Sequence, residues 1–346
     1  MPIKNFHMKL ISTNLKNLEN SYILKKSEFL YNKKRITSYL KYFLILILSF
    51  YLYLILLFEY YYKIKRHPED IFKKHRVFIE AHRGLNKEIY QNTLEAFSKT
   101  ILNNIEALET DVWITKDLIP VLVHASGPKG NIRQFFNHDG NVIELTWSEL
   151  STYRTLKDNL TIPKLRDLFK IAKNKIFINL EIKDTRPDLA FPLIISLIEE
   201  FDFFDQISIS SFNHIYYHKV LEYNKKNNRN IIFGNLYGLG NTNFNYTRKG
   251  SALNMFWTDA SQEVCKKAHE NGMAVFVYFG MNDSENYQKY DKLVNYGVDV
   301  ICSNDPVLAK IYRDNLYIKS KINKIFFKVI NDIKRMIIKN SKLIYN

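Results

Sequence analysis

The sequence of 346 residues predicts an α/β fold, a (β/α)8 TIM barrel preceded by one N-terminal transmembrane helix. Three observations support this fold class. About eight short apolar runs alternate with helical segments after residue 76, as strands and helices do in a parallel barrel. Polar side chains that could carry chemistry stand at the C-terminal ends of those runs, where barrels place their active sites. A long uncharged stretch precedes them all. A doubly wound open sheet is the competing architecture.

The first 62 residues divide into a basic tail and a candidate membrane span. Residues 1–38 are basic and polar with no clear period, which indicates a disordered tail. No charge occurs from Tyr42 to Phe58, and with Tyr60–Tyr62 this stretch would span roughly 30 Å as a helix, the thickness of a bilayer core. We therefore predict a single-pass membrane protein with its span at residues 39–62. A buried core helix is the alternative, but such a helix is rarely apolar on every face. Both flanks are basic, so the side of the membrane that carries the barrel stays open.

The barrel is predicted over residues 77–313. Strands are expected at the apolar runs 77–81, 107–112, 121–124, 176–182, 207–210, 231–236, 253–257, 274–278 and 300–303, of which 121–124 is a short run close to the second. Helices are expected between these runs, near 92–104, 165–174, 192–201, 261–271 and 283–296, with one more ending at Tyr223. Asn92 and Glu95 match a capping box, and Gly272 stands where a helix would end.

Residues 317–346 form a separate basic segment. Apolar residues recur there at helical spacing, and eight lysines and arginines accompany the single acidic residue Asp332. A basic amphipathic helix of this kind can lie on an anionic membrane surface. A terminal helix that packs on the barrel is the alternative, and the sequence does not separate the two.

Composition narrows the class of partner. The formal net charge is +15, from 50 Lys and Arg against 35 Asp and Glu, which favours anionic partners such as acidic lipid surfaces or phosphorylated substrates. No recognised nucleic-acid module accompanies this charge, so we predict no nucleic-acid partner. The two cysteines, Cys265 and Cys302, do not suggest a disulfide framework.

Three carboxylates form the candidate metal site. Glu109 and Asp111 stand two residues apart on one predicted strand, so both face the same side, about 6.6 Å apart along the chain. Glu181 ends another strand. Three carboxylates at one point repel one another unless a cation neutralises them, and oxygen ligands favour a hard cation such as Mg²⁺ or Ca²⁺. The alternative is that each carboxylate pairs with a lysine or an arginine.

Two histidines and two cations complete the candidate site. His82 and His124 are the groups of this set that could transfer protons near neutral pH, although a lone histidine at a strand end is more often structural. Arg83 can grip two phosphate oxygens at once, whereas Lys183 acts as a point charge. Gly84 allows a tight turn or a close approach of the backbone to a ligand.

These residues resemble the glycerophosphodiester phosphodiesterase family. The resemblance covers residues 77–313 and depends on the ordered combination of motifs. They are His82-Arg83-Gly84, Gln91-Asn92-Thr93, Glu109-Thr110-Asp111-Val112-Trp113-Ile114-Thr115-Lys116-Asp117, His124-Ala125, Ile162-Pro163-Lys164-Leu165, Glu181-Ile182-Lys183, Ser211-Phe212 and Gly297-Val298-Asp299-Val300-Ile301-Cys302-Ser303-Asn304-Asp305-Pro306.

The resemblance implies a TIM barrel of the PI-PLC-like phosphodiesterase type that uses a divalent cation, Mg or Ca. It implies that Glu109, Asp111 and Glu181 are the metal ligands and that His82 and His124 are the acid and base. Arg83 and Lys183 would then stabilise charge on the phosphoryl group. In this family, a glycerol hydroxyl would attack phosphorus, displace the alcohol and leave a cyclic phosphate for water to open.

Three positions depart from the family pattern: Gln91 replaces Glu, Ala125 replaces Asp, and Tyr278 stands where Trp is frequent. The leading hypothesis is therefore a membrane-tethered, metal-dependent hydrolase that cleaves glycerophosphodiesters to glycerol phosphate and an alcohol. One alternative is a lysophospholipase D-type hydrolase of membrane lysolipids. The other, motivated by Gln91 and Ala125, is a non-catalytic barrel that binds lipid headgroups at the bilayer.

Overall fold

The computed structural model describes residues 41–43, 45–54, 77–136 and 138–317, and it divides the chain into two units, Met1–Ile64 and Lys65–Asn346. In the first unit, residues 41–43 and 45–54 are helical, and most of their large apolar side chains are exposed. Within the described ranges, no helix combines the length and the apolar character that crossing a bilayer requires. The remainder of the predicted span at 39–62 and the tail at 1–38 lie outside the described residues, as does the predicted C-terminal helix except Tyr317.

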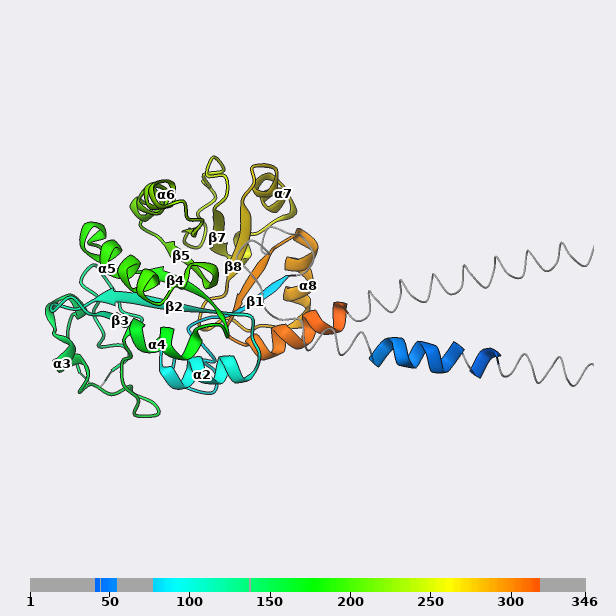
Figure 1. Ribbon diagram of the computed structural model, residues 1–346, viewed down its shortest axis with the longest axis horizontal. Coiled ribbons are helices and arrows are strands. Elements are labelled where there is room, and N and C mark those ends of the chain that lie inside the picture. Colours follow the sequence, from blue (N-terminus) through cyan, green and yellow to red (C-terminus); the bar gives the residue numbers. More distant parts are fainter. Residues whose placement is uncertain (1–40, 44, 55–76, 137, 318–346) are drawn as a thin grey trace, which may run out of the picture. The chain divides into compact units, whose positions relative to one another are not determined.

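The second unit is a closed barrel of parallel strands, shown in Figure 1 with helices around it. Strand β1 pairs in parallel with both β2 and β9, so the sheet closes on itself and the competing open sheet is ruled out. The prediction of a (β/α)8 barrel is thereby confirmed. The eight barrel strands are β1 (Phe78–Ala81), β2 (Ala107–Ile114), β4 (Phe177–Ile182), β5 (Ile207–Ser211), β6 (Ile232–Leu236), β7 (Ala252–Phe256), β8 (Ala274–Tyr278) and β9 (Val300–Ser303).

The run predicted at 121–124 is not a barrel strand. It forms β3 (Pro120–Leu122), which pairs antiparallel with the end of β2, Val112 opposite Leu122. The turn between them is too short for the crossover that a parallel pair requires. Thr115 stabilises that turn, because its hydroxyl accepts a hydrogen bond from the Ile119 backbone N–H at 2.9 Å. The antiparallel return carries the chain back along β2 toward Asp111.

Helices outside the barrel cover the strands, and two of their predicted starts are wrong. The helix expected from Pro192 begins at Pro187, because proline suits the first helical position, and Pro192 is accommodated inside the helix. The helix expected from Asp283 begins after the Asn286 cap, whose side chain accepts a hydrogen bond from the Lys289 backbone N–H. The helices are α2 (Leu94–Leu102), α3 (Trp147–Leu150), α4 (Leu165–Ala172), α5 (Pro187–Glu200), α6 (Ile215–Asn227), α7 (Gln262–Glu270) and α8 (Tyr287–Tyr296).

The barrel interior changes from apolar to polar along the strands. Near the N-terminal ends, buried apolar residues pack into a plug that includes Ile232, Ala252, Ala274, Phe276 and Val300. Side chains alternate along a strand, so residues two positions further along face the same interior. Three of those residues are polar: Glu80, Asn179 and Asn254, which follow Phe78, Phe177 and Ala252 of this apolar cluster. The apolar plug therefore closes the bottom of the barrel and leaves polar side chains above it.

Candidate active site

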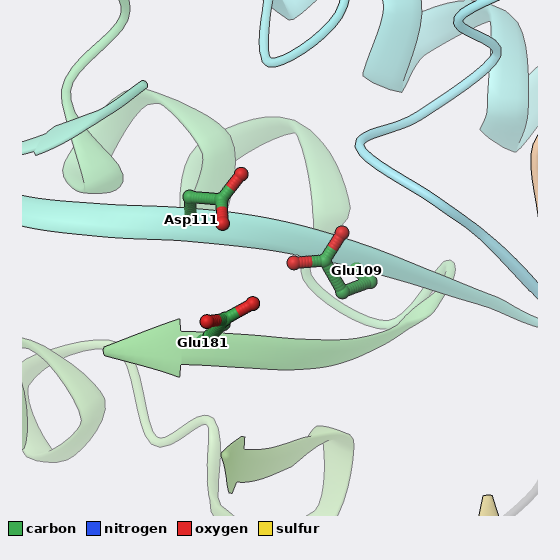
Figure 2. Close-up of side chains that lie close together, drawn as sticks. All are labelled: Glu109, Asp111 and Glu181. Atoms are coloured by element: carbon green, nitrogen blue, oxygen red, sulfur yellow. The ribbon is translucent and has the colours of Figure 1, made fainter. Parts of the chain in front are cut away.

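The three predicted carboxylates lie together at the C-terminal end of the barrel. Glu109 and Asp111 come from β2 and Glu181 from β4, with Asp111 directly opposite Glu181 in the sheet. Each offers an oxygen atom, and these oxygens lie within 4.8 Å of one another. Figure 2 shows the three side chains close together. All three side chains are buried, and Asp111 is fully so. The spacing of two residues on β2 and the parallel register with β4 together produce this convergence.

Charge in this cluster is not evenly compensated. Burial and the neighbouring Asp111 and Glu181 charges raise the pKa of Glu109 well above its usual value. Burial also raises the pKa of Glu181. For Asp111, burial favours the protonated form, but the Arg83 and Lys183 charges outweigh it and lower the pKa. The cluster therefore holds one firmly ionised carboxylate and two for which ionisation is costly.

Two cations pair with part of the cluster. Arg83 Nε lies 3.1 Å from Asp111 Oδ2, and Lys183 Nζ lies 3.5 Å from Asp111 Oδ1 and 2.7 Å from Glu181 Oε1. Glu109 receives less charge compensation, because the hydrogen bond that its Oε2 accepts, at 3.0 Å, comes from the neutral backbone N–H of Arg83. Its Oε1 is buried and has no hydrogen-bond partner among the described residues. The alternative of simple ion pairing thus accounts for Asp111 and Glu181 but leaves Glu109 uncompensated.

The uncompensated oxygen is what a bound cation would satisfy. The donor set consists of carboxylate oxygens only, which suits a hard divalent cation such as Mg²⁺ or Ca²⁺. Buried polar atoms without partners are rare in folded proteins, and such an atom beside two other carboxylates indicates a missing positive charge. The residues present therefore fit a divalent cation.

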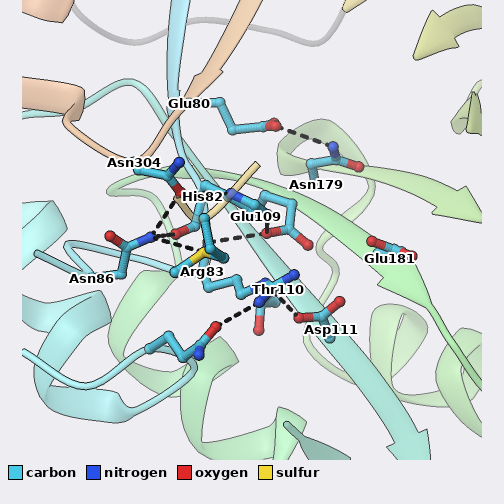
Figure 3. A network of polar contacts seen from close by, with 12 residues as sticks. Glu80, His82, Arg83, Asn86, Glu109, Thr110, Asp111, Asn179, Glu181 and Asn304 are labelled. Atoms are coloured by element: carbon cyan, nitrogen blue, oxygen red, sulfur yellow. Dashed lines mark hydrogen bonds and ion pairs between the residues drawn. The ribbon is translucent and has the colours of Figure 1, made fainter. Parts of the chain in front are cut away.

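His82 follows β1 and is fixed at the rim by its neighbours, shown in Figure 3. Its backbone N–H donates to the Ser303 carbonyl oxygen at 3.0 Å, and its Nδ1 lies 2.8 Å from Asn304 Oδ1. Its Nε2 lies 4.0 Å from Glu109 Oε2, on the side of the carboxylates. Burial and the Arg83 charge lower the pKa of His82 to about 3, so the ring is neutral near pH 7.

The amide of Asn304 determines which nitrogen of His82 carries the proton. Asn304 Nδ2 donates to the Gly280 carbonyl oxygen at 2.9 Å, which leaves Oδ1 as the acceptor facing His82. Asn86 Nδ2 also donates to that Oδ1, at 3.2 Å, and to the His82 carbonyl oxygen at 2.7 Å. Because Oδ1 can only accept, Nδ1 of the neutral ring carries the hydrogen and Nε2 is left free to accept a proton.

His124 is held differently. It follows β3, and the Val123 backbone N–H donates to the Asp111 carbonyl oxygen at 3.0 Å, which places this segment beside the cluster. The His124 ring packs edge-on against Phe135 with centroids 5.1 Å apart, and its Nδ1 is buried without a hydrogen-bond partner in the described part of the chain. Burial lowers the pKa of His124 to about 4. The sequence did not point to Phe135, which lies in an irregular segment.

A strained turn presents Arg83 to the cluster. Arg83 and Gly84 both have positive φ, 59° and 81°, and a Cβ atom on Gly84 would lie 3.1 Å from atoms of Ala96 and Phe97. Glycine is therefore required there, both for the left-handed conformation and for the close contact with α2. Arg83 Nη1 donates to Gln91 Oε1 at 2.6 Å, so Gln91 keeps a contact with the guanidinium although it carries no charge.

The capping box predicted at Asn92 is wrong. Thr93 caps α2, because its hydroxyl accepts a hydrogen bond from the Ala96 backbone N–H at 3.2 Å. Asn92 has a φ of 54° and faces the site, where its Nδ2 donates to Asp111 Oδ2 at 2.8 Å and its Oδ1 accepts from the Thr110 hydroxyl at 2.7 Å. Asn92 and Asn304 are thus site residues that sequence reasoning missed, although both stood inside motifs that it had noted.

A cavity of about 160 Å³ opens beside the cluster. Its upper wall is partly apolar and aromatic and includes Phe212, Tyr278, Phe279 and Met281. The Tyr278 hydroxyl donates to the Tyr237 carbonyl oxygen at 2.8 Å, so this residue presents its ring to the cavity and its hydroxyl to the protein. All seven predicted site residues thus lie at one end of the barrel, and six of them lie within 4.0 Å of another member of the set.

Comparisons with known proteins agree with this fold. The model of the glycerophosphoryl diester phosphodiesterase family matches residues 82–308. A glycerophosphodiester phosphodiesterase of Caldanaerobacter subterraneus subsp. tengcongensis is 26% identical over 244 residues, 67% of this chain and 95% of that protein. A phosphodiesterase of Oleispira antarctica, solved with the product sn-glycerol-3-phosphate, shares the fold at a TM-score of 0.60 and 18% identity, over 70% of this chain and 99% of that one. A glycerophosphodiester phosphodiesterase of Parabacteroides distasonis shares the fold at a TM-score of 0.58 and 19% identity, over 70% of this chain and 99% of that one.

Proposed function

The chain belongs to the glycerophosphoryl diester phosphodiesterase family and is an enzyme of that class, and on this basis we propose that it cleaves glycerophosphodiesters to glycerol phosphate and an alcohol with a divalent cation at Glu109, Asp111 and Glu181. The observation that carries the proposal is the buried Glu109 Oε1, which has no partner in the described chain and lies in a cluster of carboxylate oxygens within 4.8 Å of one another. Mg²⁺ or Ca²⁺ would supply the missing charge.

Each remaining site residue has a role in this proposal. A bound cation would polarise the phosphoryl oxygens and lower the pKa of the attacking hydroxyl. His82 is held with Nε2 free, which suits it to accept a proton, and His124 is the second proton carrier. Arg83 is buried and Lys183 partly buried beside the carboxylates, where their charge stabilises a phosphodiester anion more strongly than it would in water.

The two alternatives receive no support of comparable weight. The non-catalytic barrel was motivated by Gln91 and Ala125, but Gln91 keeps its contact with Arg83, and family membership makes the chain an enzyme. Nothing in the described residues favours a lysolipid over a water-soluble glycerophosphodiester.

The metal requirement is tested on the full chain purified in detergent. After treatment with a chelator, release of choline from glycerophosphocholine should stop, and Mg²⁺, Ca²⁺ or Mn²⁺ added in turn should restore it. Glu181→Gln should not be restored, whereas Glu88→Gln, an exposed carboxylate that pairs with Lys99, should behave as the wild type. Activity that persists in the chelator would rule out the proposed mechanism.

We further propose that residues 39–62 anchor the enzyme in a membrane as a single span. The support is the uncharged stretch from Tyr42 to Phe58 and the exposure of the apolar side chains described there. The full chain expressed in cells should stay in the membrane pellet after an alkaline carbonate wash, and a chain starting at residue 65 should be released by it. Recovery of the full chain in the wash would contradict the anchor.

A further inference from the structure

Below the carboxylates, the cavity has a floor of polar side chains that the proposed mechanism does not use. Glu80 from β1, Ser210 from β5 and Asn254 from β7 line it, and all three are at least 96% buried. Glu80 Oε2, Ser210 Oγ and Asn254 Oδ1 have no hydrogen-bond partner within the described chain. Three such atoms at the bottom of one cavity are a departure from the usual pairing of buried polar groups.

The floor is built by the same strands that carry the site. A Cβ atom on Gly234 would lie 2.8 Å from Asn254 Nδ2 and 2.9 Å from Ser210 Cβ, so Asn254 and Ser210 converge over this glycine. On the opposite side, Glu80 Oε1 accepts a hydrogen bond from Asn179 Nδ2 at 3.2 Å, a contact drawn in Figure 3. That bond holds the carboxylate in place and leaves its second oxygen unpaired.

The free atoms specify the chemistry of an occupant. A carboxylate oxygen and an amide oxygen accept hydrogen bonds, and a serine hydroxyl can do either. The apolar plug of the barrel lies beneath them, so donors must come from the cavity itself. Burial raises the pKa of Glu80 to about 7, although the side chains of Asn179 and Cys302 oppose this rise. With about 160 Å³, the cavity exceeds the ~10–15 Å³ that a single water requires.

We propose that Glu80, Ser210 and Asn254 form a subsite for a hydrogen-bond-donating part of the substrate, namely hydroxyl groups or a primary ammonium group. The proposal rests on the proposed function, since it assigns a place to one end of a phosphodiester held at the carboxylates. Two sources share this chemistry: the glycerol that every glycerophosphodiester carries, and a leaving alcohol such as ethanolamine. A quaternary ammonium group such as that of choline has no hydrogen to donate.

The test compares two serines on one strand. Ser210→Ala removes an unpaired hydroxyl that lines the cavity. Ser208→Ala removes a hydroxyl in the same interior that is already bonded to Asn179 Oδ1 at 3.3 Å and does not line the cavity. Asn254→Leu removes the amide acceptor at similar size. Values of kcat and KM are measured for the full chain with glycerophosphoethanolamine, glycerophosphocholine and 2-hydroxyethyl 4-nitrophenyl phosphate, which keeps the attacking hydroxyl and has no further donor group.

The expected result is a change in selectivity. In Ser210→Ala and Asn254→Leu, the ratio of kcat/KM for glycerophosphoethanolamine to that for 2-hydroxyethyl 4-nitrophenyl phosphate should fall by about three- to tenfold, mainly through KM, as expected for loss of one hydrogen bond. An equal fall with glycerophosphocholine would assign the floor to the glycerol. A fall confined to glycerophosphoethanolamine would assign it to the leaving alcohol. Ser208→Ala should leave the ratio as in the wild type.

Two results would overturn the subsite. One is an unchanged ratio in both floor variants, and the other is an equal change in Ser208→Ala. Activity of each variant on 2-hydroxyethyl 4-nitrophenyl phosphate and its thermal unfolding midpoint show that it has folded, and Ser210→Ala still tests the subsite if Asn254→Leu does not fold. A wild-type chain inactive on all three substrates would instead refute the proposed function itself, so the two failures are distinct.

Discussion

Nδ1 of His82 lies 2.8 Å from Oδ1 of Asn304, and the orientation of the Asn304 amide is set by the Gly280 carbonyl oxygen. This contact leaves the proton-accepting nitrogen of His82 on the side of the carboxylates. A partly buried carboxylate in turn holds the Asn304 backbone, because the Asn304 N–H donates to Glu285 Oε1 at 2.7 Å. The loop after β9 thus orients a histidine that follows β1.

We expect Asn304→Leu to lower kcat by about 10- to 100-fold with little change in KM, a part of the 10²–10⁴ that general acid–base catalysis typically contributes. The variant removes the acceptor for Nδ1–H, so the ring loses its preferred tautomer. Asn304→Asp keeps an acceptor at the same place and should retain most of the activity. Steady-state kinetics check both, and equal losses in the two variants would show that the amide acts only through packing.

Cation binding should stabilise the protein. A ligand that binds only the folded state at 100 times its Kd adds about 2.7 kcal/mol, so Ca²⁺ or Mg²⁺ should raise the Tm of chelator-treated protein. Glu109→Gln should reduce this rise, and without cation it should be more stable than the wild type, because burial and the neighbouring carboxylates oppose ionisation of Glu109. Calorimetric unfolding scans with and without cation measure both effects. A wild-type Tm that does not respond to any divalent cation would argue against the site.

His124 should make the protein sensitive to acid. Its pKa is lowered by burial from 6.5 to about 4, so the unfolded chain binds a proton between these values while the folded chain does not. Stability from this residue is therefore present above pH 6.5 and is lost as pH falls toward 4, by up to about 3 kcal/mol. Urea unfolding of wild type and His124→Gln at pH 7.5 and 4.5, both in chelator, should show a smaller loss in the variant. Parallel losses would indicate that other groups control the acid response.

Gly84→Ala should destabilise the fold by about 1–3 kcal/mol, because the added Cβ meets Ala96 and Phe97 at a positive φ. Gly127→Ala is a matched control, since Gly127 has a φ of 70° and no atom within 4 Å of its added Cβ. Denaturant unfolding should show a clearly larger loss for Gly84→Ala. If both variants lose the same amount, the backbone conformation alone explains the glycine and the contact with α2 does not matter.

Local patterns predicted the barrel and the members of its site, because strand alternation and the position of polar residues at strand ends are properties of short segments. The same patterns gave the wrong role to residues whose partners are distant in sequence. Asn92 matches a helix cap, but its amide instead joins Asp111 to Thr110. Pro192 looks like a helix start, but the apolar face of α5 packs on the barrel on both sides of it.

The sequence by itself determined the order of the elements, the seven residues proposed for the chemistry and the carboxylate set that fits a hard cation. Closure of the barrel decided the rest. It brought Asn304 to His82 across 222 positions, left one oxygen of Glu109 without a partner, and lined the cavity floor with Glu80, Ser210 and Asn254. The physical reason is that hydrogen-bond satisfaction and burial depend on which strands become neighbours in space, and no local pattern records that.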